Sequence, residues 1–140
     1  MNESIFWTKL AQKVGYITET YKVVTQDGYI LQLNKIAGSK KSPDVWVDNV
    51  RGTRYSRKHL YPSHSDFWIW HEIGIYNVPV IIDYIIEQTK QKKIFVITHS
   101  QDSTVYFVMA SERPEYQKKI LAPIVFISRT KVPLFRVLAL

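Results

Sequence analysis

The segment from Ile94 to Ala110 constrains the fold more than any other part of this sequence. A short β-branched run from Ile94 to Ile97 stops at small polar residues, and a mostly apolar segment from Val105 to Ala110 continues to Pro114. A run of the first kind is typical of a buried strand, and the second favours a helix. This order predicts a strand, a sharp turn and a helix, with Ser100 in the turn.

A serine in such a turn is a candidate site. Ser100 stands between His99 and Gln101. A strand-to-helix turn lifts a serine hydroxyl above the sheet and aims a helix N-terminus at it, which is how an α/β-hydrolase carries its nucleophile. The matching pattern is Gly-x-Ser-x-Gly, but Thr98 and Asp102 fill the two glycine positions here. Ser100 is therefore the candidate nucleophile, in a turn that departs from the pattern.

The first part of the chain predicts an antiparallel hairpin. Apolar and polar residues alternate from Glu19 to Thr25 and again from Tyr29 to Ile36, with Gln26-Asp27-Gly28 between them. Asp-Gly favours a tight turn because glycine accepts a positive φ. A polar linker from Ala37 to Pro43 then leads to a short strand of the buried type at Val45–Val47.

The middle of the chain predicts a loop and then a helix. Residues from Thr53 to Ile75 are aromatic and polar without a clear period, which favours a packed, irregular loop. Asn77 is a plausible N-cap and Pro79 fits a first helical turn. The apolar residues that follow predict a helix with a wide apolar face that ends near Lys90.

Together these elements predict an α/β fold with a mixed sheet. A strand, a crossover helix and a strand form a right-handed parallel unit, here with Val45–Val47 and Ile94–Ile97 as its strands. A final strand is expected at Ile124–Ile127, after Pro123. A chain of 140 residues can bury one core, so residues 1–140 are expected to form one domain.

Composition narrows the classes of partner. The chain has 19 Lys and Arg against 12 Asp and Glu, a net charge of +7. Such a charge permits binding to phosphates, but the basic residues stand in pairs at the ends of predicted elements, which indicates solvated edges. No nucleic-acid partner is expected. The absence of cysteine excludes disulfides, thiolate catalysis and cysteine-ligated metals.

The sequence shows no membrane or export signal. No apolar stretch approaches the roughly 20 residues that span a bilayer, so no transmembrane segment is expected. Residues Met1 to Lys9 lack the basic start and the continuous apolar region of a signal peptide. As written, the chain would stay in the cytosol.

Several motifs resemble, in the same order, the acid lipase family of lysosomal and gastric lipases. The match runs from about Gly15 onward, and His71-Glu72-Ile73-Gly74 and Met109–Tyr116 are most similar to insect members. The motifs are Gly15-Tyr16 with Glu19, Val24–Leu31, Asn49–His59, Phe67-Trp68, His71–Gly74 with Tyr76 and Pro79, His99–Gln101, Ser111–Tyr116 and Leu121-Ala122-Pro123.

The resemblance implies an α/β-hydrolase fold and a known chemistry. Members hydrolyse triacylglycerols and sterol esters with a Ser-Asp-His triad and without metal or cofactor, in lysosomes or after secretion. Carried over, Ser100 is the nucleophile, the backbone amide of Gln101 supplies one oxyanion donor, and the substrate is a lipid ester.

The triad partners do not carry over. They should follow the serine, yet all four histidines precede Ser100 and Asp102 is the only aspartate after it. His99 is expected to point away from Ser100 and to pack or cap. His59, His64 and His71 match no common ligand spacing, so no metal site is expected.

The chain also departs from the family between Ile36 and Asp44. Seven residues separate them, where family members carry a strand and a His-Gly oxyanion loop. The fold is therefore expected to be partial, without that strand, the second oxyanion donor and the C-terminal half. Loss of a central strand leaves backbone groups unpaired on its neighbours, which puts the sheet in doubt.

The elbow residues and the surface complete the expectations. The Cβ atoms of Thr98 and Asp102 are expected to crowd the turn. The Asp102 carboxylate opposes a developing oxyanion, although an acid also suits a helix N-terminus. We therefore expect a lipase-family chain that is inactive by itself. Two alternatives stay open: a non-catalytic lipid- or partner-binding remnant that self-associates through exposed apolar surface, and a degraded or mis-spliced gene product.

Overall fold

The computed structural model describes residues 3–49, 51, 56, 58–60 and 70–126, which form an α/β structure with two sheets. An antiparallel sheet has the order β1-β2-β3, and a parallel sheet pairs β4 with β5. The elements are α1 (Glu3–Lys13), β1 (Thr18–Val24), β2 (Ile30–Ile36), β3 (Val45–Asp48), α2 (Trp70–Glu72), the π-helix η1 (Ile73–Asn77), α3 (Val78–Thr89), β4 (Ile94–His99), α4 (Gln101–Glu112), the 3-10 helix η2 (Pro114–Lys119) and β5 (Ile120–Phe126).

The opening hairpin is confirmed. β1 and β2 pair in antiparallel register from Thr18 with Ile36 to Val24 with Ile30. Gly28 has a φ of 93° in the connecting turn, and its N–H donates to the carbonyl of Thr25 at 3.0 Å. The Asp-Gly signal predicted this turn because it depends only on local backbone preference.

The predicted parallel unit of Val45–Val47 with Ile94–Ile97 is wrong. β3 pairs antiparallel with β2, from Leu33 with Asp48 to Ile36 with Val45, and no ladder joins β3 to β4 in the described residues. The backbones of Ser39 and Ser42 exchange two hydrogen bonds, so the linker is a hairpin turn that returns the chain beside β2. A connection this short forces antiparallel pairing. The expected mixed sheet is therefore two sheets, and β3 is only partly buried.

Several element boundaries differ from those predicted. Residues 70–75 are helical, and the rest of the expected loop, except 56 and 58–60, lies outside the described residues. Asn77 has a helical φ of −69° and caps nothing with its side chain, because α2, η1 and α3 run on continuously. Pro79 in the first turn and an end near Lys90 are confirmed. β5 begins at Ile120 and contains Pro123, which an edge strand tolerates. Ile127 lies outside the described residues.

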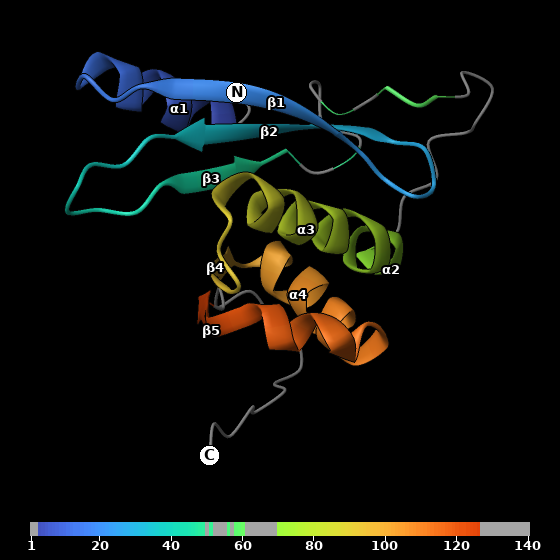
Figure 1. Ribbon diagram of the computed structural model, residues 1–140. Coiled ribbons are helices and arrows are strands. Elements are labelled where there is room, and N and C mark those ends of the chain that lie inside the picture. Colours follow the sequence, from blue (N-terminus) through green and yellow to red (C-terminus); the bar gives the residue numbers. More distant parts are fainter. Residues whose placement is uncertain (1–2, 50, 52–55, 57, 61–69, 127–140) are drawn as a thin grey trace.

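Helix α3 connects the two sheets. Figure 1 shows α3 between the three-stranded sheet and α4, with β4 and β5 beyond. Its Ile85 packs with Val23 and Leu33 of the antiparallel sheet, and its Ile82 packs in a second cluster with Tyr106, Met109, Tyr116 and Ile120. No described helix is long and apolar enough to cross a membrane.

Gly74 lets η1 approach α4 closely. A Cβ at this position would lie 2.7 Å from a methyl carbon of Val108 and 3.0 Å from the carbonyl oxygen of Val105. No side chain fits at such distances, so the glycine of the His-Glu-Ile-Gly motif has a packing role.

Candidate active-site elbow

Ser100 forms the sharp turn between β4 and α4. Its φ of 53° and ψ of −112° lie outside the usual regions for a residue with a Cβ, at a cost on the order of 1–3 kcal/mol. The Ser100 N–H donates to the carbonyl of Phe126 at 2.9 Å, and the Ser100 carbonyl accepts from the N–H of Ser103 at 3.1 Å. The side chain is exposed at the end of the strand. The predicted strand, turn and helix are therefore confirmed, and Ser100 occupies the strained position.

Gln101 is the first residue of α4. The first N–H groups of a helix have no intrahelical acceptor, and they lie at the positive end of the helix dipole. A negative oxygen that forms next to Ser100 therefore meets backbone donors at this end of α4. This is the geometry that the oxyanion role of Gln101 needs, and that role stays a prediction.

The turn accommodates Thr98 and Asp102 without the expected backbone strain. Among the described residues other than glycine, only Lys90 and Ser100 have a positive φ. Thr98 is 7% exposed, and its Oγ1 lies 3.1 Å from the Oγ of Ser103. Asp102 is exposed in the first turn of α4, the position of an ordinary helix N-terminal acid. The elbow therefore tolerates a β-carbon at both glycine positions of the pattern.

The described histidines have structural or exposed positions. His99 is exposed at the end of β4, which contradicts the expected packing role, while the alternative capping role stays a prediction. His59 is half-buried, with its Nε2 2.7 Å from the carbonyl oxygen of Asp27 and its ring edge-on to Tyr29. His71 is exposed, and His64 lies outside the described residues. Within the described residues, no three His, Cys, Asp or Glu side chains could hold a metal ion.

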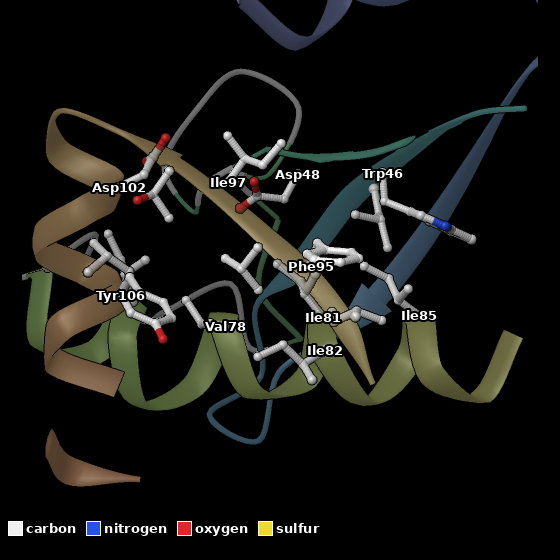
Figure 2. Close-up of a pocket in the computed structure, with 16 residues that line it drawn as sticks. Trp46, Asp48, Val78, Ile81, Ile82, Ile85, Phe95, Ile97, Asp102 and Tyr106 are labelled. Atoms are coloured by element: carbon white, nitrogen blue, oxygen red, sulfur yellow. The ribbon is translucent and has the colours of Figure 1, made fainter. Parts of the chain in front are cut away.

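A cavity of about 160 Å³ lies between the two sheets, beside the elbow. Figure 2 shows its lining, which includes Trp46 and Asp48 from β3, Phe95 and Ile97 from β4, and Asp102 from α4. Isoleucines of α3 form another wall. Side chains from both faces of β4 line the cavity, so the cavity follows the edge of β4 that faces β3.

Asp48 is a site residue that the sequence did not reveal. Asp48 is exposed at the end of β3 and lines the cavity, and other protein atoms lie around its carboxyl group. Burial among these atoms raises the pKa of Asp48 to about 6, and repulsion from the Asp102 carboxylate adds to the rise. No local pattern predicts this, because Asp48 and Asp102 belong to elements that are far apart in the sequence.

Comparisons with known proteins agree with the fold and the motifs. A family profile described as a partial α/β-hydrolase lipase region matches residues 7–109. Lipase 1 of Drosophila melanogaster is 36% identical over 88% of this chain and 37% of its own length. Lipase 3 of the same fly is 35% identical over 89% and 44%, and human gastric triacylglycerol lipase is 31% identical over 84% and 42%. The chain spans about two fifths of the length of the curated relatives it matches.

The alignment lengths indicate an internal gap. The comparison with Lipase 1 extends over 164 residues, whereas 88% of this 140-residue chain is about 123 residues. About 40 aligned positions therefore have no counterpart here. This agrees with the partial fold that the motifs predict, and the placement of the gap between Ile36 and Asp44 stays a prediction.

Proposed function

The chain belongs to the acid lipase family of α/β-hydrolases, and we propose that its elbow is the nucleophile site of a lipid ester hydrolase. In this proposal the Ser100 hydroxyl attacks the ester carbonyl, and the N–H of Gln101 donates to the oxygen that becomes negative. The observation that carries the proposal is the backbone of Ser100, because a strained strand-to-helix turn is typical of α/β-hydrolase nucleophiles.

The proposed substrates are carboxylic esters of lipids. Support comes from the relatives, which include gastric triacylglycerol lipases of human, mouse, cow and rat. The mostly apolar cavity beside the elbow agrees with an apolar acyl group near Ser100. The reaction needs no cofactor, because a serine nucleophile, a base and backbone donors suffice for ester hydrolysis.

We also propose that residues 1–140 do not hydrolyse esters by themselves. The sequence has no histidine after Ser100, and its only aspartate there, Asp102, is two residues away on α4. A histidine base in the usual chain order is therefore not among these 140 residues. Loss of triad members lowers kcat by about 10⁴–10⁶-fold in serine hydrolases, which leaves little activity.

Chemical rescue tests the role of Ser100. The chain is incubated with a p-nitrophenyl alkylphosphonate, with and without imidazole, and the modified peptide is identified by mass spectrometry. The Ser100 Oγ–P bond forms, p-nitrophenolate leaves with the bonding electrons, and imidazole accepts the serine proton. Ser111, exposed at the other end of α4, is the internal control. We expect imidazole-dependent label on Ser100 and little on Ser111. Equal labelling of both serines, or none on Ser100, would overturn the proposal.

A second candidate function is supported by the outer face of the β4–β5 sheet. Phe95 and Ile97 are 63% and 68% exposed, and Ile124 and Phe126 on β5 are 46% and 55% exposed. Ile97 pairs with Ile124 in the parallel register, so their side chains share one face. An apolar sheet face of this kind marks a surface for lipid or for a second copy of the chain. The alternative function is therefore non-catalytic binding with self-association.

A further inference from the structure

Two buried hydroxyl groups lie on the inner side of the elbow. Thr98 is the second-last residue of β4, and Ser103 is in the first turn of α4. They are 7% and 4% exposed, and their hydroxyl oxygens are 3.1 Å apart. The Ser103 hydroxyl also donates to the carbonyl of Phe126 at 3.2 Å, which is the carbonyl that accepts the N–H of Ser100 at 2.9 Å.

The direction of these hydrogen bonds follows from the inventory of donors. A serine hydroxyl has one proton, and Ser103 gives it to the carbonyl oxygen of Phe126. Thr98 must therefore be the donor to Ser103. The result is a directed chain from Thr98 to Ser103 to Phe126, and the Ser100 N–H converges on the same carbonyl.

The strained backbone of Ser100 needs such support. A residue at φ 53° and ψ −112° returns to a relaxed conformation unless its surroundings hold it. The hydrogen-bonded chain ties the end of β4, the first turn of α4 and the end of β5 together around this one residue. If either hydroxyl is removed, the other stays buried and loses its hydrogen-bond partner, which costs free energy.

We infer that Thr98 and Ser103 are positioning residues that hold Ser100 in its strained conformation. Thr98 occupies a glycine position of the nucleophile pattern, and its hydroxyl links β4 to α4, a contact that glycine could not make. The relevance to catalysis rests on the proposed nucleophile role of Ser100. The conformational claim stands on the geometry alone.

Amide hydrogen exchange measured by NMR tests the inference. Thr98→Val keeps the shape and strand preference of the side chain but removes the hydroxyl, whereas Thr98→Ser keeps the hydroxyl. Ser103→Ala removes the second hydroxyl, and Thr104→Val is the control at the exposed neighbouring position. The readouts are the exchange rate of the Ser100 N–H and, as a reference for general stability, that of the buried Ile85 in α3.

We expect Thr98→Val and Ser103→Ala each to raise the Ser100 exchange rate about three- to tenfold, the range for one neutral hydrogen bond. The Ile85 rate should not change, and Thr98→Ser and Thr104→Val should match the parent. The double variant should exchange no faster than the faster single variant, because the two hydroxyls act as one chain.

Equal Ser100 rates in Thr98→Val and Thr98→Ser would overturn the inference, and so would a parallel rise at Ile85. If Ser103→Ala does not fold, the comparison of Thr98→Val with Thr98→Ser tests the inference by itself. Failure of the proposed nucleophile would appear instead in the phosphonate labelling of the unaltered chain, which does not depend on these exchange rates.

Discussion

The surroundings of the two sheets differ. A buried charge is paired beside the antiparallel sheet, whereas the parallel sheet has a cavity at its edge and an exposed apolar side chain. Beside the antiparallel sheet, Arg51 is 1% exposed and fully engaged. Its Nη1 and Nη2 donate to the Asp27 carboxylate at 2.5 and 2.9 Å, and its Nε donates to Oδ1 of Asn77 at 2.8 Å. The guanidinium also lies 4.2 Å from the centre of the Tyr29 ring. Beside the parallel sheet, one edge of β4 faces a cavity and the apolar Phe95 is exposed.

Two aspartates of the antiparallel part, Asp27 in the Arg51 network and Asp48 at the cavity, have opposite pKa shifts. Burial by itself raises the pKa of Asp27, but hydrogen bonds from Arg51 and Thr25 and the charge of Arg51 hold it below its usual value. Burial also raises the pKa of Asp48, and its charged neighbour is another carboxylate, so the value reaches about 6. Asp27 thus has the charged partner that a buried carboxylate needs, whereas Asp48 lies near a second carboxylate.

The largest effect is expected from breaking the Arg51 network. Arg51→Met should lower the free energy of unfolding by about 3–5 kcal/mol, because it leaves Asp27 and Asn77 without their buried partner. Urea denaturation followed by circular dichroism measures the loss, with the exposed Lys58→Met as control. A loss from Arg51→Met no larger than that of the control would show that the network does not stabilise the fold.

The exposed face of the parallel sheet should bind apolar probes. The parent chain should bind ANS and self-associate, and Phe95→Lys with Ile97→Lys should reduce both several-fold, because it puts charges on the apolar face. Dye fluorescence and light scattering measure the change. Val24→Lys, an exposed apolar position on β1, is the control for added charge. A monomeric parent that binds no dye would contradict this prediction.

Restoring the glycines of the elbow should lower stability. Glycine raises stability at a position only where the backbone has a positive φ, and neither Thr98 nor Asp102 has one. Thr98→Gly with Asp102→Gly should cost about 2 kcal/mol, from chain entropy in a strand and a helix and from the lost Thr98 hydrogen bond. Ester hydrolysis should not return, since no proton acceptor is added. A higher thermal midpoint, or restored hydrolysis, would refute this reading of the elbow.

The smallest effect is expected at Asp48. Its pKa of about 6 in the folded state exceeds the ordinary 3.8, so the parent loses stability as pH rises from about 4 through about 6. Asp48→Asn removes this loss. The variant should be more stable at pH 7.5, by less than about 1 kcal/mol because the carboxyl group keeps contact with water, and equal to the parent near pH 3.5. Lower stability of Asp48→Asn at pH 7.5 would contradict the assignment.

The sequence predicted what depends on neighbouring residues. Asp27-Gly28 specified the hairpin, Pro79 marked the start of its helix, and the run through Ser100 specified the elbow. The partner of β3 was predicted wrongly, because the order strand, helix, strand suggested a parallel unit with β4, whereas the short linker after β2 allows only an antiparallel hairpin. The side-chain partner of Asn77 is Arg51, 26 residues earlier, so its residue type suggested a helix cap instead.

The candidate site was likewise only partly predictable from the sequence. The position of Ser100 followed from the local pattern, whereas its support by Thr98 and Ser103 requires the carbonyl of Phe126, which comes from β5. The raised pKa of Asp48 likewise depends on a second carboxylate in a distant element. That residues 1–140 form one domain stays a proposal, and a single cooperative unfolding transition in both sheets would support it.

The central claim is that Ser100 stands in a nucleophile position while residues 1–140 by themselves lack its base. Hydrolysis of a short-chain p-nitrophenyl ester by the purified chain and by Ser100→Ala tests this most directly. We predict the same background rate for both proteins, without imidazole and across neutral pH. Turnover by the parent chain that disappears in Ser100→Ala would contradict the account, because it would show that a base within these 140 residues reaches Ser100.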